Sequence, residues 1–312
     1  MLRLFCLFTL FFVASAQAEV RVLTSIKPLQ LIAAAVQDGV GEPEVLLPPG
    51  ASPHHYALRP SDVRRVRDAD LLYWIGPDME AFLPRVLGSR DKPHVAVQDL
   101  PGMTLRHFGE SHEEHDHDDH DHEHAHAGDD LGHDHDHRPG SLDAHLWLAA
   151  DNARIIAARM AADLTKLDAV NAGLYAANLQ AFEARLDALD GRIRPQLAAL
   201  QGKPYFVFHE AFDYFEAAYG LKHAGVFSVL TEVQPGARHV AAMRERLQQT
   251  GPSCVFSEPP LRPRLAETLT AGLPVKLAEL DALGGALPVS ANGYEQLLEN
   301  LAGGLSECLN SL

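Results

Sequence analysis

Strand-like and helix-like segments alternate along this chain, once before residue 100 and again after residue 204. Short apolar runs bounded by Pro or Gly predict strands, and the longer segments between them predict helices. The expected strands cover 20–26, 43–47, 69–75, 94–97, 205–208, 225–229, 254–256 and 275–279. The expected helices cover 28–36, a short stretch from Pro60, 78–87, 146–168, 211–219, 235–249, 263–269 and 294–309. This alternation predicts an α/β fold of two similar lobes, each a small parallel sheet flanked by helices.

One long helix is expected between the two lobes, from Asn171 to Ala199. Its apolar residues recur mostly at steps of three and four, which predicts a single apolar stripe: Leu174, Leu179, Phe182, Leu186, Leu189, Ile193, Leu197 and Leu200. At 1.5 Å per residue such a helix spans roughly 40 Å. Gly191 and Pro195 are the positions where a bend or an early end is expected. We therefore expect an N-terminal lobe over 19–168, a rigid connecting helix over 169–200 and a C-terminal lobe over 201–312.

A run of histidine and acid interrupts the first lobe between Glu110 and His137. It holds 12 of the 42 acids and ten of the 18 histidines, namely His112, His115, His117, His120, His122, His124, His126, His133, His135 and His137. Few apolar residues are present to offset the entropy of ordering it, so we expect a disordered loop over 110–138. Imidazole and carboxylate are ligands of divalent transition metals, which favours a metal-binding segment, for zinc in the first place, over a merely solvated linker. The run does not indicate whether metal is stored, sensed, carried or used in catalysis.

The first 18 residues have the pattern of a secretory signal peptide. Arg3 precedes the apolar stretch Leu4 to Val13, and Ala16-Gln17-Ala18 forms a small-residue cleavage site. The stretch is too short to span a bilayer, and no later segment approaches the length that a span requires. We expect a periplasmic protein that starts at Glu19 and is not embedded in the membrane.

Two cysteines, Cys254 and Cys308, remain after removal of the signal. In an oxidising compartment they predict either one disulfide or two unpaired buried thiols. The formal net charge is −16, and the acids of the histidine run account for most of it. The rest of the chain is mildly acidic and has no basic patch, so nucleic acid is not an expected partner.

Three further histidines stand at the ends of strand-like segments, where open α/β sheets place their ligands. His54 follows an expected strand and a Gly/Pro loop, His145 lies in Asp143-Ala144-His145-Leu146-Trp147-Leu148, and His209 ends the apolar run 205–208. Asp281 follows a later strand. Together, three imidazoles and a carboxylate would form a tetrahedral zinc shell. The remaining histidines lack such context: His55, His94, His107, His223 and His239.

Several of these stretches resemble the metal-binding periplasmic proteins of ABC importers (cluster A-I), and most closely their zinc-specific branch. The matching stretches run in order along the chain: 50–62 (GASPHHYALRPSD), 143–148 (DAHLWL), 206–210 (FVFHE), 233–236 (VQPG), 254–259 (CVFSEP) and 280–281 (LD). The acidic histidine loop, which lies between the first and second of these stretches, is itself typical of the zinc branch.

The resemblance implies that His54, His145 and His209 bind zinc between the lobes. Asp281 is then either a direct ligand or a partner that orients a ligand, with water in the fourth position. Manganese relatives carry a carboxylate where His209 stands, and some zinc relatives carry a glutamate where this chain has Pro53. The resemblance also implies a disulfide between Cys254 and Cys308.

The expected function is therefore high-affinity zinc capture and delivery to the membrane permease of an ABC importer, by a monomer that is not an enzyme. One alternative is a manganese- or iron-binding member of the same family. Another is a secreted zinc hydrolase, although the chain has no His-Glu-x-x-His pair and no Gly-x-Ser-x-Gly elbow. A third is a periplasmic zinc buffer that works without a transporter.

Overall fold

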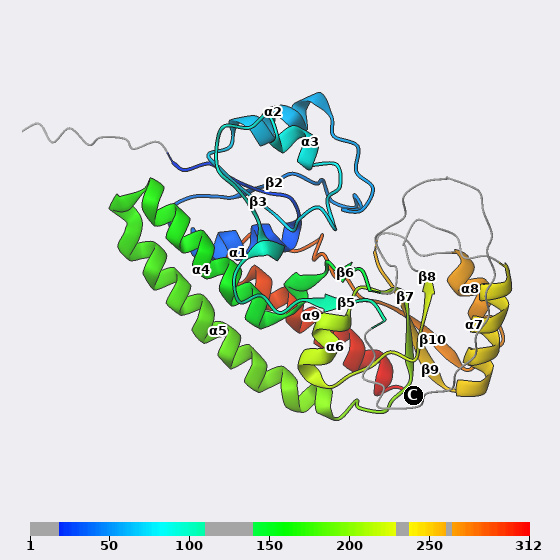
Figure 1. The fold of residues 1–312 in the computed structure, drawn as a ribbon. Coiled ribbons are helices and arrows are strands. Elements are labelled where there is room, and N and C mark those ends of the chain that lie inside the picture. The colour runs from blue at the N-terminus through cyan, green and yellow to red at the C-terminus, as the bar shows by residue number, and fades with distance from the viewer. Residues whose placement is uncertain (1–18, 110–139, 229–236, 260–263) are drawn as a thin grey trace, which may run out of the picture.

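The computed structural model describes residues 19–109, 140–228, 237–259 and 264–312. Its first sheet has the strand order β2-β1-β3-β4, and all neighbouring strands are parallel (Figure 1). The two central strands, β1 (Val22–Thr24) and β3 (Leu71–Trp74), are buried along their whole length. Such burial is expected where helices cover both faces of a parallel sheet. The edge strands are β2 (Glu44–Val45) and β4 (His94–Ala96), and the helices are α1 (Lys27–Val36), α2 (Pro60–Asp68) and α3 (Pro84–Leu87).

The second sheet is also fully parallel, with the order β10-β9-β7-β8. Its strands are β7 (Tyr205–His209), β8 (Gly225–Ser228), β9 (Ser253–Ser257) and β10 (Val275–Glu279). Helices α6 (Asp213–Tyr219) and α9 (Gly293–Leu309) lie on one side of it, and α7 (Ala237–Thr250) and α8 (Arg264–Thr270) lie on the other (Figure 1). The prediction of two lobes with parallel sheets is confirmed.

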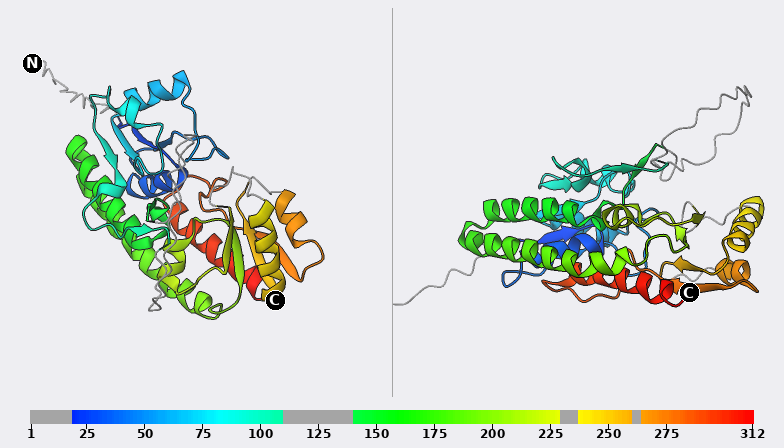
Figure 2. Two further views of the ribbon diagram at one scale, coloured as in Figure 1. Left: turned by 45° about the vertical axis from the view of Figure 1, so that its right-hand side comes forward. Right: turned by 90° about the horizontal axis from the view of Figure 1, so that it is seen from below.

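Helix α5 (Ala172–Ala198) runs past both lobes and joins them (Figure 2). It pairs with α4 (Ala150–Leu167) and contacts α1 on the first lobe and α6 on the second. Most of the predicted stripe is buried from Phe182 onward, but Leu174 is exposed and Tyr175 is buried beside it. The helix continues through both Gly191 and Pro195. Buried Ile193 and Leu197 hold this last part against the core. None of the described helices, α5 included, has the length and apolar character needed to cross a bilayer.

The C-terminal helix α9 packs against both lobes. It contacts α1 and α5 as well as its own strands β9 and β10, and the largest hydrophobic core of the described residues runs from Val22 to Leu309 through it. A smaller core around Phe206, Phe227 and Leu247 belongs to the second lobe alone. Because the two lobes share the larger core, hinge motion between them would have to break apolar packing.

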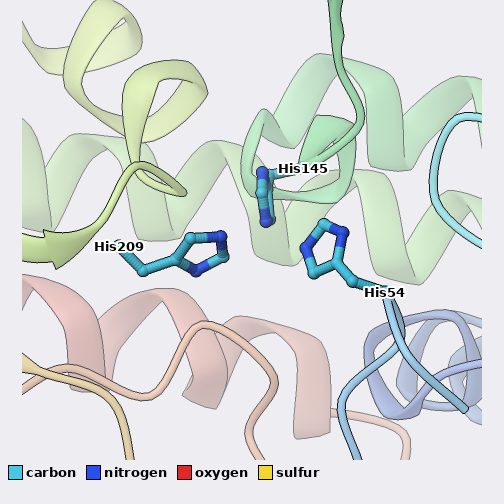
Figure 3. A group of neighbouring side chains, drawn as sticks. All are labelled: His54, His145 and His209. Atoms are coloured by element: carbon cyan, nitrogen blue, oxygen red, sulfur yellow. The ribbon is translucent and has the colours of Figure 1, made fainter. Parts of the chain in front are cut away.

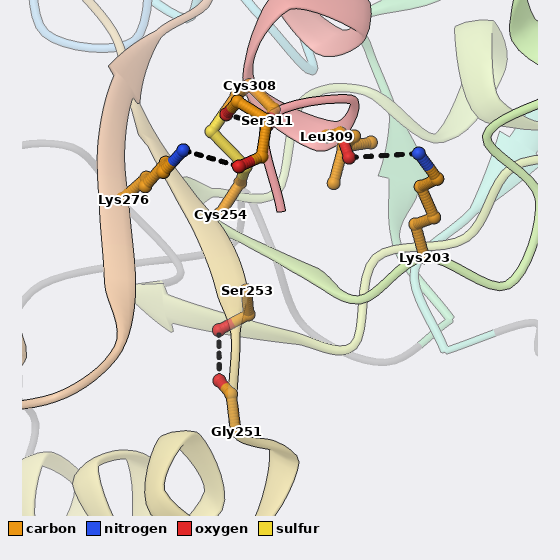
Figure 4. The surroundings of a disulfide bond; sticks show 8 residues. All are labelled: Lys203, Gly251, Ser253, Cys254, Lys276, Cys308, Leu309 and Ser311. Carbon is orange, nitrogen blue, oxygen red and sulfur yellow. Dashed lines mark hydrogen bonds between the residues drawn. A yellow bond between two sulfur atoms is a disulfide. The ribbon is translucent and has the colours of Figure 1, made fainter.

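A disulfide joins Cys254 in β9 to Cys308 near the end of α9 (Figure 4). Lys203 Nζ donates a hydrogen bond of 3.0 Å to the carbonyl of Leu309 close by, and Lys276 Nζ donates one to the carbonyl of Ser311. These contacts fix the end of α9 to the second sheet. Of the two alternatives that the cysteines left open, the structure has the disulfide.

Besides shifts at the ends of elements, of which the start of the helix expected over 146–168 at Ala150 is one, the structure differs from the sequence prediction at two places. The helix expected over 78–87 is only the single turn α3, because the buried Glu80 carboxylate accepts hydrogen bonds from the backbone N–H groups of Ile75 and Gly76 and shapes the preceding residues into turns. The second difference is an antiparallel pair, β5 (Arg106–His107) with β6 (Leu142–Asp143), which the sequence did not indicate. These short strands precede and follow the histidine run, which itself lies outside the described residues, as does the expected signal peptide.

Candidate metal centre

Three histidines from distant parts of the chain face one another between the lobes (Figure 3). His54 lies in the loop after β2, His145 directly precedes the short 3-10 helix η2 (Leu146–Leu148), and His209 is the last residue of β7. The ring centroid of His54 lies 5.5 Å from the ring centroid of His145 and equally far from that of His209. The ring centroids of His145 and His209 are 5.0 Å apart. One ligand nitrogen from each ring lies within 4.8 Å of the other two.

All three imidazoles are buried, at 7%, 3% and 3% exposure for His54, His145 and His209. Three imidazoles that converge on one point each offer a ring nitrogen to a common partner. A single cation with a tetrahedral or similar shell would satisfy one nitrogen of each ring. The group therefore has the chemistry and the spacing of a transition-metal site.

A buried carboxylate orients His145. Asp143 Oδ1 lies 2.8 Å from His145 Nδ1 and also accepts a hydrogen bond of 3.0 Å from the backbone N–H of His145. Burial raises the pKa of Asp143 well above its ordinary value, and the nearby Asp213 and Glu210 carboxylates raise it further, although the His145 N–H opposes them. With Nδ1 held by Asp143, Nε2 of His145 is the nitrogen left for a metal.

A second carboxylate orients His209 in the same way. Glu258 Oε1 lies 2.9 Å from His209 Nδ1. Glu258 follows β9, which is the parallel neighbour of β7, so the carboxyl ends of the two strands bring the pair together. Two carboxylate–imidazole pairs around one centre match the common arrangement in which a metal-binding histidine donates its other N–H to an acid.

Asp281 lines the same cavity, but it does not join the three histidines in the group of converging ligand atoms. Its Oδ1 accepts hydrogen bonds from the backbone N–H groups of Leu283 and Gly284, and its Oδ2 accepts one from Gly285, at 2.8–3.0 Å. The carboxylate therefore shapes its own loop at the edge of the cavity. A water molecule held by Asp281 would fit the fourth position as well as a direct bond would.

The cavity has a volume of about 410 Å³ and is walled by small and apolar residues, among them Pro49, Trp147 and Ala282. Trp147 Nε1 donates a hydrogen bond of 2.8 Å to the carbonyl of Ala282, and the Tyr294 hydroxyl donates one to the carbonyl of Trp147. These bonds link the segment that carries His145 to the loop that carries Asp281 and to α9. The segments that carry His145 and Asp281 are thereby held against each other and against α9.

Two groups of residues remain: predicted histidines that the structure does not describe, and carboxylates that were not predicted. The ten histidines of the run, from His112 to His137, lie outside the described residues. Asp143 and Glu258 were missed as partners of the central histidines. A usable sequence signal existed for Glu258, because it ends a strand in the same lobe as His209, and parallel neighbours end at the same edge. For Asp143 the signal was its position two residues before His145.

The comparisons with known proteins agree on one family. A family model described as the periplasmic component A of a zinc-uptake complex (ZnuA) matches residues 22–308. The high-affinity zinc uptake system protein ZnuA of Yersinia pestis is 40% identical over 294 residues, which cover 94% of this chain and 92% of that protein. A crystal structure of ZnuA is similar in fold, with a TM-score of 0.74 at 21% identity and coverage of 94% and 100%. The solute-binding protein FpvC of Pseudomonas aeruginosa in complex with Mn²⁺ has a TM-score of 0.72 at 20% identity, with coverage of 94% and 99%.

Proposed function

The chain belongs to the ZnuA family of periplasmic zinc-uptake components, and we propose that it captures Zn²⁺ at His54, His145 and His209 and delivers it to the membrane permease of an ABC importer. The family consists of solute-binding proteins and not of enzymes, so the hydrolase alternative falls away. The observation that carries the proposal is the convergence of three buried imidazoles within 4.8 Å. Residues 1–18 would direct the chain to the periplasm.

The ligand set favours zinc over manganese. Three neutral imidazoles offer nitrogen, which suits Zn²⁺, whereas carboxylate and water oxygens suit Mn²⁺. The similar fold of the FpvC–Mn²⁺ complex means that the fold alone does not choose the metal. The choice rests instead on the nitrogen that His209 supplies.

Capture would require only small movements. His54 and His145 belong to the first lobe and His209 to the second, so a bound ion bridges them. Because α9 and α5 pack against both lobes, closure would consist of loop shifts and slight tilts. The rims of the two lobes around the cavity would then form the surface that the permease recognises.

The histidine run would act as an auxiliary collector that binds further zinc weakly near the central site. Deletion of residues 110–137 is expected to leave one tight zinc site per chain, because no described ligand of that site lies within the deleted segment. The total zinc stoichiometry should fall. Isothermal titration calorimetry of the full and shortened chains measures both quantities.

A variant of full length in which the ten histidines of the run are replaced by asparagine is the matched control, since it keeps the loop and its acids. It should lose the weak binding as the deletion does. Loss of the tight site in both variants would show that the run supplies ligands to the centre, and the assignment to His54, His145 and His209 would then be wrong.

Glu258 is expected to act on zinc through His209. The change Glu258→Ala should weaken the tight site by about 10- to 100-fold, because His209 Nδ1 loses the partner that fixes the ring. Glu258→Gln should keep most of the affinity, since its amide oxygen still accepts from Nδ1–H. Competition with a chromophoric chelator measures the affinities.

Thermal unfolding of the metal-free variants separates positioning from general destabilisation. The control is Glu267→Ala, which removes an exposed acid from α8 in the same lobe. Equal zinc affinities for Glu258→Ala, Glu258→Gln and this control would mean that Glu258 does not orient the ligand.

A further inference from the structure

A second group of metal-ligand residues lies beside α6, apart from the three central histidines. One ligand atom from each of Glu210, Asp213 and His223 lies within 4.8 Å of the other two, and all three residues are partly exposed. Glu210 follows His209 directly. Because neighbouring residues of an extended chain point to opposite sides, the two can serve different sites.

The local sequence builds this group. Glu210, Asp213 and Glu216 are spaced by three residues, so Asp213 and Glu216 share a face of α6 and Glu210 lies just before it. Gly220 ends the helix with a φ of +67°, a left-handed conformation that glycine adopts without strain. The chain then returns and places His223 Nδ1 3.0 Å from Glu216 Oε2 and 3.8 Å from Asp213 Oδ1.

Three carboxylates are crowded together in this group. Glu210, Asp213 and Glu216 lie close together, with Arg106 and Lys222 as the cations that act on Asp213 besides His223. Burial raises the pKa of both Glu210 and Asp213, and a neighbouring carboxylate is the next cause in each case. Among the described residues no side-chain hydrogen bond satisfies the Glu210 carboxylate.

A proton on His223 neutralises only part of this charge. Burial lowers the pKa of His223, but the hydrogen bond that its ring donates to Glu216, together with the surrounding carboxylates, outweighs burial and raises the pKa. His223 donates its Nδ1 proton to Glu216 in a hydrogen bond, and Glu216 Oε1 also accepts one of 2.7 Å from the Tyr205 hydroxyl. Buried Asp143, on which both of these acids act, has an Oδ2 without a hydrogen-bond partner in the described structure.

We propose that Glu210, Asp213 and His223 form a second divalent-cation site, rich in oxygen ligands and weaker for zinc than the three-histidine centre. Two carboxylates with one imidazole offer Mn²⁺ more of the oxygen ligands that it prefers than three imidazoles do. The site shares no ligand with the three-histidine centre, so it does not depend on the function proposed for that centre.

The site lies beside the two strands that flank the histidine run. Tyr214, on the same helix, accepts a hydrogen bond of 2.9 Å from the backbone N–H of Arg106 in β5 and donates one of 2.8 Å to the carbonyl of Asp143 in β6. These two strands immediately precede and follow residues 110–139. A cation held here stands where the histidine run joins the fold and close to Asp143, the carboxylate that orients His145.

Counting Mn²⁺ on the zinc-loaded full chain tests the proposal. After one equivalent of Zn²⁺ fills the tight site, Mn²⁺ is added and its free fraction is measured by electron paramagnetic resonance. The double change Glu210→Gln/Asp213→Asn should weaken the strongest Mn²⁺ site by about a hundredfold, because it removes two ligand charges. Glu42→Gln/Glu307→Gln removes two exposed charges elsewhere and should leave that site unchanged. Equal Mn²⁺ binding in the two double variants overturns the proposal. Retention of the tightly bound Zn²⁺ in the Glu210→Gln/Asp213→Asn variant shows that the two sites are separate.

A second measurement needs no variant that could misfold. Mn²⁺ at substoichiometric amounts should broaden the imidazole resonances of His223 before those of His94, an exposed histidine on β4, because paramagnetic broadening falls steeply with distance. Broadening of both at the same Mn²⁺ concentration, or of His94 first, would show that no cation is held beside α6.

Discussion

Replacement of His209 by alanine is expected to weaken zinc binding by about a hundred- to a thousandfold. Structural zinc sites with four ligands contribute about 10–16 kcal/mol, so one imidazole accounts for roughly 3–4 kcal/mol. His209 is also the one central histidine that the second lobe supplies, so its loss removes the bridge between the lobes. Chelator competition at constant pH measures the change.

The control is His94→Ala, which removes an exposed histidine from β4, outside the central group. It should bind zinc as the unchanged protein does. A further change, His209→Asp, should narrow the preference for zinc over manganese, because an oxygen ligand replaces a nitrogen. Zinc affinity that is unaffected by His209→Ala would remove the basis of the proposed function.

Loss of the disulfide is expected to lower the free energy of unfolding by about 4 kcal/mol. Cys254 and Cys308 are 54 residues apart, and the loop-entropy model assigns a stabilisation of that order to a closure of this length. The double change Cys254→Ser/Cys308→Ser removes the link between β9 and the end of α9. Urea unfolding of the variant and of the oxidised protein measures the difference.

The unchanged protein under reducing conditions is the control, and it should lose a similar amount of stability. Zinc affinity of the folded variant should stay the same, because Cys254 lies near the start of β9 whereas Glu258 lies beyond its end. A change in the free energy of unfolding below about 1 kcal/mol would mean that the packing of α9, and not the covalent link, holds this end of the molecule.

Much of the fold follows from local pattern. The alternation of apolar runs and helical segments placed the parallel strands within a few residues, and the apolar stripe predicted α5 in full. The prediction was wrong where a single buried side chain overrides the pattern, as Glu80 does before α3. It missed β5 and β6 because a pair of two-residue strands has too few residues to show a period.

The candidate site shows the same division. Of the three central histidines, His209 directly follows an apolar run, which a strand delivers to the edge of a sheet. His54 and His145 were weak candidates by spacing, and the family resemblance added them to His209. The role of Asp281 did not follow, because its hydrogen bonds to Leu283, Gly284 and Gly285 depend on the shape of its loop. His223 lacked any signal, since its partners Asp213 and Glu216 meet it only after the turn at Gly220.

The sequence by itself determined where apolar periodicity predicts strands and helices and which side chains carry metal-binding atoms, because these properties depend on neighbours only a few positions away. The tertiary structure decided which of those side chains meet. His209 and Glu258 are 49 residues apart and pair only because β7 and β9 are adjacent in the sheet. The sharing of α9 between the lobes is likewise a matter of packing. Contacts of this kind depend on the order of the strands and on which helix faces meet, and no local periodicity records either.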